Sequence, residues 1–217
     1  MAQQERARRT RAAIVEAAAH EFSKRGYTAA SVNTILEGSR ATKGAMYFHF
    51  SSKEDLARAV LQTASEKYRE IMSTPRPAGV DALEWLHSLI VELARSFDES
   101  VVVRAEFRLI IEPEFYATIR EGAGAIWGQT AFDLAAEAHR EGLLRPDIDP
   151  RQFTRVLVTS LAGQRYMSDL TADETDLAAL FEESLEVLLM AMASPEWLDG
   201  WRARGWSDVL APVGADA

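Results

Sequence analysis

The chain has 217 residues, of which 47% are hydrophobic and 26% charged, a balance typical of a globular protein with one large domain or two smaller ones. It has no cysteine, which excludes disulfides and thiolate chemistry and suits a reducing cytoplasm. No apolar run approaches the roughly 18 residues of a membrane span. No uninterrupted apolar segment follows the basic start. We therefore expect neither a membrane contact nor a signal peptide.

The net charge of −9 is distributed unevenly along the chain. Residues 1–55 hold nine Lys or Arg against six Asp or Glu, a net of +3, which leaves 15 against 27, or −12, for the remainder. A basic head on an acidic body suggests that the head meets an anion and the body does not. The alternative is that the arginine-rich N-terminus is a solvated helix without a partner.

Hydrophobic spacing predicts helices from the N-terminus onward. The first carries an apolar residue at every fourth position from Ile14 to Phe22, and Gly26 ends it after two basic residues. Ser31 opens a short second helix, residues 31–38, and Thr42 opens a third, residues 42–48. Two short helices joined by about three residues and preceded by a longer one form the pattern of a helix-turn-helix.

The start of the third helix is the predicted contact with DNA bases. In a helix-turn-helix, the first residues of the second short helix reach base edges in the major groove. Here these are Thr42, Lys43 and Gly44. Lys43 can donate to guanine O6 and N7, and Gly44 lets the backbone approach the DNA closely. The helix start capped by Thr42 also offers N–H groups to a phosphate.

The aromatic residues that follow divide between DNA and core. Tyr47 and His49 are expected to hydrogen-bond phosphates, and Lys53 to hold the DNA backbone from the first turn of a fourth helix. The residues expected to pack inward are Ala45, Met46 and Phe50. Ser51 and Ser52 precede Glu54 and Asp55 at capping-box spacing and start that fourth helix. The whole DNA-binding set is Ser31, Arg40, Thr42, Lys43, Gly44, Tyr47, His49 and Lys53.

The rest of the chain is also predicted to be helical, which makes the fold all-α. We divide it into a DNA-binding domain, residues 1–55, and a body for ligand binding and dimerisation, residues 56–217. The first break in the helical pattern, STPRPAG at 73–79, lies near this boundary. Further helices are expected at 83–97, at 101–111, in a long segment from Pro113 to the cap at Gly142, from Asp149-Pro150, over 177–192, and in a short tail carrying Trp197 and Trp201.

The stretch TKGAMYFHFSSKEDL, residues 42–56, resembles the DNA-binding head of the TetR family of one-component repressors. The resemblance covers roughly residues 8–60 and rests on the Thr-Lys-Gly and Tyr-Phe-His-Phe elements at the family's spacing. The family's turn usually reads Ala-Gly-Val, whereas this chain has Ser-Arg-Ala at 39–41. Arg40 must therefore accept a strained left-handed conformation, or another turn must form with help from Gly38. Arg40 is also a candidate phosphate contact.

The head, together with VVVRAEFRL at 101–109, Trp127 and SPEWLDGW at 194–201, is similar to the γ-butyrolactone receptor branch from actinomycetes. That resemblance implies a repressor of antibiotic and signalling genes that binds a pseudo-palindromic operator as a homodimer. It leaves the DNA when a small butyrolactone or furan-type signal binds. The last two long helices would form the dimer interface, and the alternative is that their apolar stripes, including 177–192, are internal core.

The resemblance also places Trp127 in a ligand cavity of the body. Glycines at 122, 124 and 128 cost helix stability and would leave room beside it. The candidate ligand-binding residues are Trp85, Phe107, Trp127, Gln129, Thr159 and Gln164. The aromatic members would supply apolar walls, and the polar members would hydrogen-bond a lactone, hydroxyl or carboxylate. For each of them, ordinary packing or a solvated side chain is the alternative.

Other functions are less consistent with the sequence. The four histidines include no pair at metal-ligand spacing on one helix face, and neither a phosphate-binding loop nor a nucleophile elbow is present. We therefore expect no enzyme and no cofactor. Two alternatives stay open: a drug-responsive repressor of an efflux pump, and a ligand-binding protein that has lost operator binding because of its altered turn.

Overall fold

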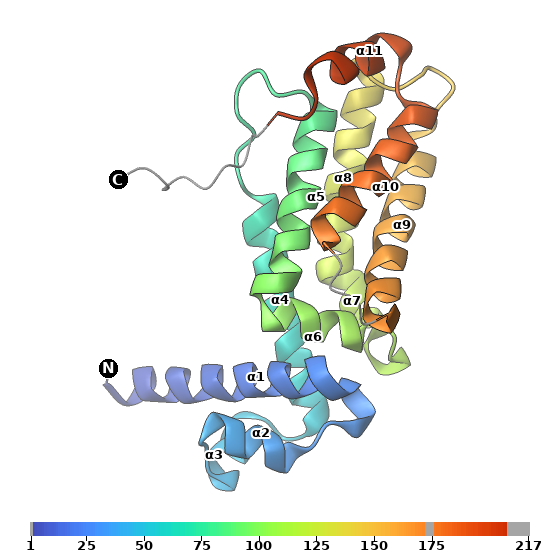
Figure 1. The fold of residues 1–217 in the computed structure, drawn as a ribbon. Helices are drawn as coiled ribbons and strands as arrows, with labels where there is room; N and C mark the ends of the chain where they lie inside the picture. The colour runs from blue at the N-terminus through green and yellow to red at the C-terminus, as the bar shows by residue number, and fades with distance from the viewer. Residues whose placement is uncertain (1, 172–175, 208–217) are drawn as a thin grey trace. The chain divides into compact units, whose positions relative to one another are not determined.

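The computed structural model describes residues 2–171 and 176–207, and within these ranges the chain is helical, which confirms the all-α prediction (Figure 1). The elements are α1 (Ala2–Ala29), α2 (Val32–Ser39), α3 (Lys43–His49), α4 (Lys53–Met72), α5 (Ala82–Glu99), α6 (Val101–Leu109), the 3-10 turn η1 (Pro113–Phe115), α7 (Tyr116–Glu121), α8 (Ala123–Arg140), α9 (Pro150–Thr171), α10 (Leu177–Met192) and α11 (Pro195–Arg204). None of the described helices is long and apolar enough to cross a membrane.

The chain packs into two compact units, each assembled from segments far apart in sequence. Unit 1 consists of Met1–Glu70 and Ser96–Ile126. Unit 2 consists of Ile71–Arg95 and Trp127–Ala217. The helix-turn-helix thus shares its core with α6, η1 and α7, which come much later in the chain. The predicted division into domains of residues 1–55 and 56–217 stays a prediction.

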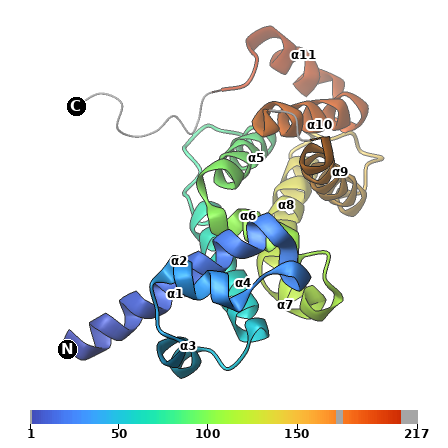
Figure 2. The ribbon, with the colours of Figure 1, turned by 60° about the horizontal axis from the view of Figure 1, so that its bottom comes forward.

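Unit 1 is organised around α1, which packs along α6 and carries α2 and α3 beside it (Figure 2). The predicted apolar face is buried completely, with Ile14, Ala18 and Phe22 all at 0% exposure. Gly26 adopts a positive φ of 70°, so α1 kinks where the sequence predicted its end. The kink turns the chain toward Ser31, whose N–H donates to the buried carboxylate of Glu21 (2.9 Å).

The long segment expected from Pro113 to the cap at Gly142 consists of three helical pieces, η1, α7 and α8. The chain breaks at Gly122, where α7 ends. A Cβ atom at Gly122 would lie 2.5 Å from Ser65 Oγ on α4, so only glycine allows this close approach. On the same side of α4, Arg58 donates to Thr118 Oγ1 of α7 (2.6 Å). These contacts hold α7 against α4 within unit 1.

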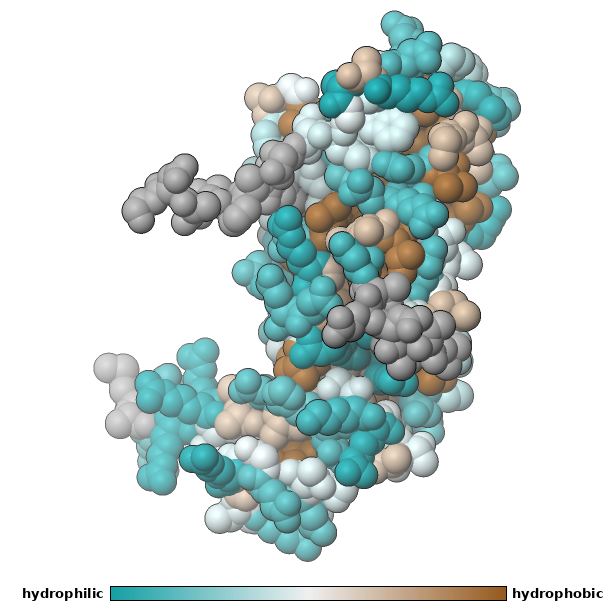
Figure 3. All heavy atoms as spheres, viewed as in Figure 1, coloured by the Kyte–Doolittle hydropathy of each residue, from teal (hydrophilic) through white to brown (hydrophobic). Residues whose placement is uncertain are grey.

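In unit 2, α5, α8, α9 and α10 lie side by side, and α11 crosses one end (Figure 1). The predicted stripe on α10 is buried at Leu177, Phe181, Leu185, Leu188 and Leu189. Both α9 and α10 also have exposed apolar residues, which are Val156, Met167, Val187 and Met190. Brown, hydrophobic atoms are visible on the surface over α10 in Figure 3. The predicted apolar stripes are therefore partly core and partly exposed surface.

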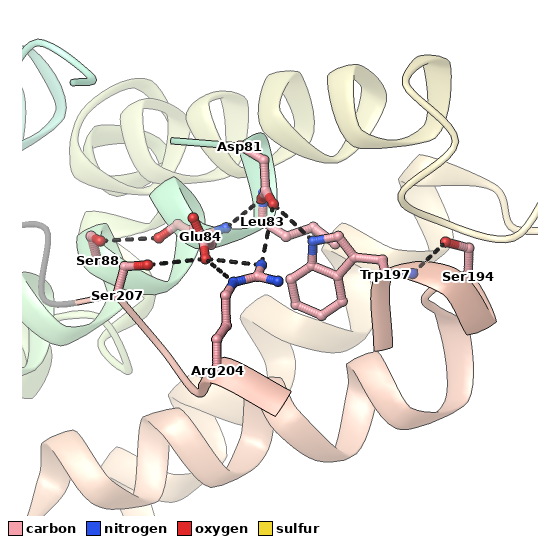
Figure 4. A network of polar contacts seen from close by, with 8 residues as sticks. All are labelled: Asp81, Leu83, Glu84, Ser88, Ser194, Trp197, Arg204 and Ser207. Carbon is pink, nitrogen blue, oxygen red and sulfur yellow. Dashed lines mark hydrogen bonds and ion pairs between the residues drawn. The ribbon is translucent and has the colours of Figure 1, made fainter. Parts of the chain in front are cut away.

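The tail helix α11 is fastened to the beginning of α5 by a polar network (Figure 4). Asp81 accepts from the backbone N–H groups of Leu83 and Glu84 through Oδ1 and from Trp197 Nε1 through Oδ2 (2.8 Å). Arg204 pairs with the buried carboxylate of Glu84 (3.0 Å). The Asp81 side chain therefore caps α5 and also binds the tail helix through Trp197.

Trp206 adds an aromatic contact to the same tail. Its ring stacks on His87 of α5 at a centroid distance of 4.0 Å, and its Nε1 donates to Glu186 of α10 (2.9 Å). Burial lowers the pKa of His87, although the nearby Glu182 opposes that shift. The tail tryptophans thus pack onto α5 and α10 of their own unit.

Candidate nucleic-acid interface and ligand-binding residues

The turn between α2 and α3 follows the first of the two predicted alternatives. Arg40 takes the left-handed conformation (φ 53°, ψ 24°), while Gly38 stays in α2. A non-glycine residue in this region costs roughly 1–2 kcal/mol. Two hydrogen bonds hold the turn: the Arg40 N–H donates to Glu37 O (3.2 Å), and the Ala41 N–H donates to Ser39 Oγ (3.3 Å). The chain accepts local strain here and keeps the helix-turn-helix geometry.

α3 presents one exposed edge and one buried face. Thr42 caps it by accepting from Ala45 N–H (3.1 Å), as predicted. Thr42, Lys43 and Gly44 are all exposed at the start of the helix. Tyr47, one turn later, is 52% exposed. Of the three residues predicted to face inward, Met46 and Phe50 are buried and Ala45 is half-buried. Four of the predicted DNA-binding residues therefore share the exposed edge.

Three other predicted contacts have different surroundings. His49 is half-buried beside Phe48, with ring centroids 5.0 Å apart. Ser31 caps α2 by accepting from Thr34 N–H (3.5 Å). Arg40 is exposed and lines a hollow of about 430 Å³ between α1 and α2. Ser31 therefore has a structural role in the free protein, while Arg40 remains available to a phosphate.

Phe48 is a residue that the sequence reasoning missed. It is 80% exposed, more than any other large hydrophobic residue among those the structure describes. It follows Tyr47 on a helix whose inward positions are already filled by Met46 and Phe50. Its ring contacts His49 edge-to-face and is otherwise largely open to solvent, so it is accessible to an external partner. The missed signal was spacing, since Phe48 cannot share a helix face with both of those residues.

Lys53 has contacts within the protein that the sequence did not predict. Its ammonium donates to the carbonyls of Tyr27 (2.8 Å), Thr28 (3.2 Å) and Ala30 (3.2 Å), and it lies 4.7 Å from the centre of the Tyr27 ring. An ammonium has three donor hydrogens, and these carbonyls can engage all of them. In the free protein Lys53 therefore caps the end of α1, and its expected phosphate contact stays a prediction.

The start of α4 confirms the predicted capping box. Ser52 Oγ accepts from Asp55 N–H (3.0 Å), and the Asp55 carboxylate accepts from Ser51 N–H (3.0 Å). Hydrogen bonds from the Ser51 hydroxyl and N–H hold the pKa of Asp55 below its usual value. The cap thereby fixes where α4 begins relative to α3.

The predicted ligand residues are distributed over both units. Trp85 and Trp127 are buried in unit 2, at 5% and 6% exposure. Phe107 belongs to unit 1, where its ring packs on Phe97 at 5.8 Å. Gln164 donates to Ser184 Oγ (3.4 Å) and so links α9 to α10. These four residues all have internal contacts or burial that ordinary packing explains.

Gln129 and Thr159 are brought together. Both line a solvent-open hollow of about 620 Å³ between α8 and α9. Gln129 donates to Asp133 (2.8 Å), and Thr159 donates to the carbonyl of Arg155 (2.7 Å). Gly128 lies in the same wall, and a Cβ atom there would meet nothing within 4 Å. Trp127 is not among the residues that line this hollow, so the cavity predicted beside it stays a prediction.

The chain is similar to known proteins in sequence and in structure. Residues 14–60 match the family model described as bacterial regulatory proteins, tetR family. The A-factor receptor protein of Streptomyces griseus is 31% identical over 217 residues, covering 97% of this chain and 74% of that protein. The chain belongs to the TetR family.

Solved TetR-family structures agree with the fold. CprB of Streptomyces coelicolor, solved in complex with its biological operator sequence, is 32% identical with a TM-score of 0.75, covering 92% of this chain and 94% of that one. A gamma-butyrolactone receptor described as an ArpA-like protein is 28% identical with a TM-score of 0.74, covering 91% and 95%. The resemblance to the TetR family and to its butyrolactone receptors is confirmed, and membership in a family of regulatory proteins agrees with the expectation of no enzyme.

Proposed function

We propose that the protein is a transcriptional repressor that binds a pseudo-palindromic operator as a homodimer and releases it when a small butyrolactone- or furan-type signal binds. The observation that carries the proposal is the exposed edge of α3. A capped helix start, a free lysine and a side-chain-free glycine stand together there, next to a buried face that fixes their orientation. The likeness to CprB, which was solved with operator DNA, supports the same use of this edge.

The chemical class of the signal is proposed from similar proteins, and the release of DNA is argued from thermodynamic coupling. The similar proteins include an A-factor receptor and a gamma-butyrolactone receptor. A ligand in the body that favours one arrangement of the dimer over another shifts operator affinity by the same coupling free energy. A dimer with its reading helices one helical turn apart, about 34 Å, matches a two-fold operator. A coupling of a few kcal/mol is enough to vacate it.

The experiment is a gel shift of the full-length protein on DNA upstream of its own gene, at fixed salt, with and without an organic extract of the source culture. We expect a specific shift that the extract abolishes. A shift that ignores the extract would contradict the signal and leave a repressor of another kind, such as an efflux regulator. Absence of binding on every candidate promoter would favour a sensor without an operator.

Lys43→Ala is the variant that ties the gel shift to α3. We expect it to weaken operator binding by about 1–3 kcal/mol and to relax the preference at one base pair, because Lys43 donates to a base edge. The matched control is Lys67→Ala, which removes the same charge from an exposed ion pair on α4. Equal losses for both variants would mean that charge alone, and not base reading, drives binding.

A further inference from the structure

The hollow between α8 and α9 in unit 2 has the volume expected for a small-molecule site. Its volume of about 620 Å³ lies within the range of roughly 300–1,000 Å³ typical of such sites. α8 contributes Gly128, Gln129 and Phe132 to the wall. The residues from α9 are Arg151, Thr154, Arg155, Val158 and Thr159.

Two positive charges in this wall are not neutralised from within. Arg151 and Arg155 stand one turn apart on α9, where like charges repel. Neither guanidinium forms an ion pair with a carboxylate in the part of the chain that the structure describes. The body around them carries a net charge of −12 over residues 56–217, so acidic residues were abundant. The uncompensated pair favours an external anion.

The remaining wall offers apolar surface and space rather than further donors. The Arg151 guanidinium lies 5.0 Å from the centre of the Phe132 ring, which keeps the cation beside an aromatic face. The hydroxyls of Thr154 and Thr159 and the amide of Gln129 already donate to oxygen atoms of their own helices. The two guanidiniums retain most of the unused donors, beside one N–H of the Gln129 amide, so an occupant that supplies acceptor oxygens and negative charge fits this wall.

We propose that this hollow binds a small organic acid. Its carboxylate pairs with Arg151 and Arg155, since a guanidinium fork matches a carboxylate geometrically. Its apolar part lies against Phe132 and over Gly128, where no side chain occupies the space. The site does not depend on the proposed regulatory function, and it is tested without DNA.

The first test is a calorimetric titration of the full-length protein with benzoate, an aromatic carboxylate of suitable size, and with benzamide as its neutral analogue. We expect saturable binding of benzoate and none of benzamide. Arg151→Gln and Arg155→Gln should each weaken benzoate about tenfold, because each removes one charged partner. Arg202→Gln, an equal charge change on the exposed side of α11, should leave the affinity unchanged.

A second variant blocks the space and keeps both charges. Gly128→Leu places a side chain in the open hollow, and because Gly128 lies inside α8 the change should also raise the melting temperature. We expect this stable variant to lose benzoate binding. Unaltered binding by Gly128→Leu or by both arginine variants would overturn the site, as would no binding of benzoate to the wild-type protein. Equal affinity for sulfate would overturn the assignment to an organic acid.

Discussion

Phe48 makes the sharpest residue-level prediction about DNA. Its exposed ring is suited to an apolar contact with a thymine C5-methyl group in the major groove. Phe48→Ala should cost on the order of 1 kcal/mol of operator affinity, comparable to one buried methyl contact. The measurement is a double-mutant cycle in which the operator's thymines are replaced one at a time by deoxyuridine.

The double-mutant cycle separates the loss of a thymine-methyl contact from a general effect of the substitution on the protein. In the wild-type protein one thymine-to-deoxyuridine change should weaken binding, and in Phe48→Ala the same change should have no further effect. Purely additive losses at every thymine would show that Phe48 does not contact a methyl group. The thermal stability of Phe48→Ala serves as the control, and it should equal that of wild type because the ring is 80% exposed.

Glu106 makes a prediction about stability and pH. Burial raises the pKa of this carboxyl to about 7 from its ordinary 4.5, and the hydrogen bond with Tyr68 opposes the shift only in part. Between those two pH values the folded state holds the proton more tightly than the unfolded state. The free energy of unfolding should therefore fall by on the order of 3 kcal/mol as the pH rises through this window.

Glu106→Gln tests that sign. A neutral amide can still accept from Tyr68, so the variant should lose this pH dependence and be more stable than wild type at pH 8. Denaturant unfolding at pH 5 and pH 8 measures both values. Glu66→Gln, an exposed position on α4, is the control and should follow wild type. A pH slope unchanged in Glu106→Gln would mean that other groups cause it.

At the scale of elements, Lys53 decides how α1 and α4 are joined. Lys53→Met keeps the aliphatic stem and removes three charge-assisted hydrogen bonds to the end of α1. We expect the free energy of unfolding to fall by about 1–2 kcal/mol. This is less than three buried charge-assisted hydrogen bonds would contribute, because the site is partly solvated. Amide exchange should accelerate in residues 27–30, where the carbonyls lose their cap.

The salt dependence of operator binding distinguishes this cap from a phosphate contact. A lysine that neutralises a phosphate contributes about one unit to the slope of affinity against salt. If Lys53 caps α1, Lys53→Met should leave the slope unchanged. A slope reduced by one, with normal stability, would restore the role first inferred from the sequence.

The helices were predictable from sequence because their signals are local. The spacing from Ile14 to Phe22, the caps at Ser31 and Thr42, and the glycine at 142 each act within a few residues. The close approach of Gly122 to α4 was not predictable, because Ser65 lies 57 positions earlier in the chain. The cap that Lys53 forms on α1 was not predictable for the same reason: the carbonyls that it reaches are 23 to 26 residues away.

The candidate site also contains residues that local sequence signals bring together and residues that only tertiary packing brings together. Thr42, Lys43, Gly44 and Tyr47 share an edge because helix periodicity places them there. The ligand residues follow no such period, and the six predicted ones fall into two packing units. Which of their side chains meet depends on tertiary packing, and a single sequence contains no local signal for it.

At the scale of the whole molecule, five of the six ligand candidates belong to unit 2, whereas Phe107 and the DNA edge belong to unit 1. A ligand bound by the five candidates of unit 2 would therefore require coupling between units to affect DNA binding. Trp127 tests the ligand side. Trp127→Phe conserves an aromatic core residue, whereas alanine would leave a costly cavity at a 6% exposed position. We expect normal operator binding and a weaker release by the culture extract in the gel shift. A normal response would remove Trp127 from the pocket, and Trp201→Phe in the tail is the control.

The tryptophans have one further consequence. All five, at positions 85, 127, 197, 201 and 206, belong to unit 2, while the reading helix has only tyrosine and phenylalanine. Excitation at the red edge of the absorption band therefore selects emission from unit 2 alone. Tryptophan fluorescence therefore reports on unit 2 without an added label. A spectral change on adding a small molecule indicates a change in unit 2. A spectral change on adding DNA indicates that operator binding at α3 in unit 1 also alters unit 2.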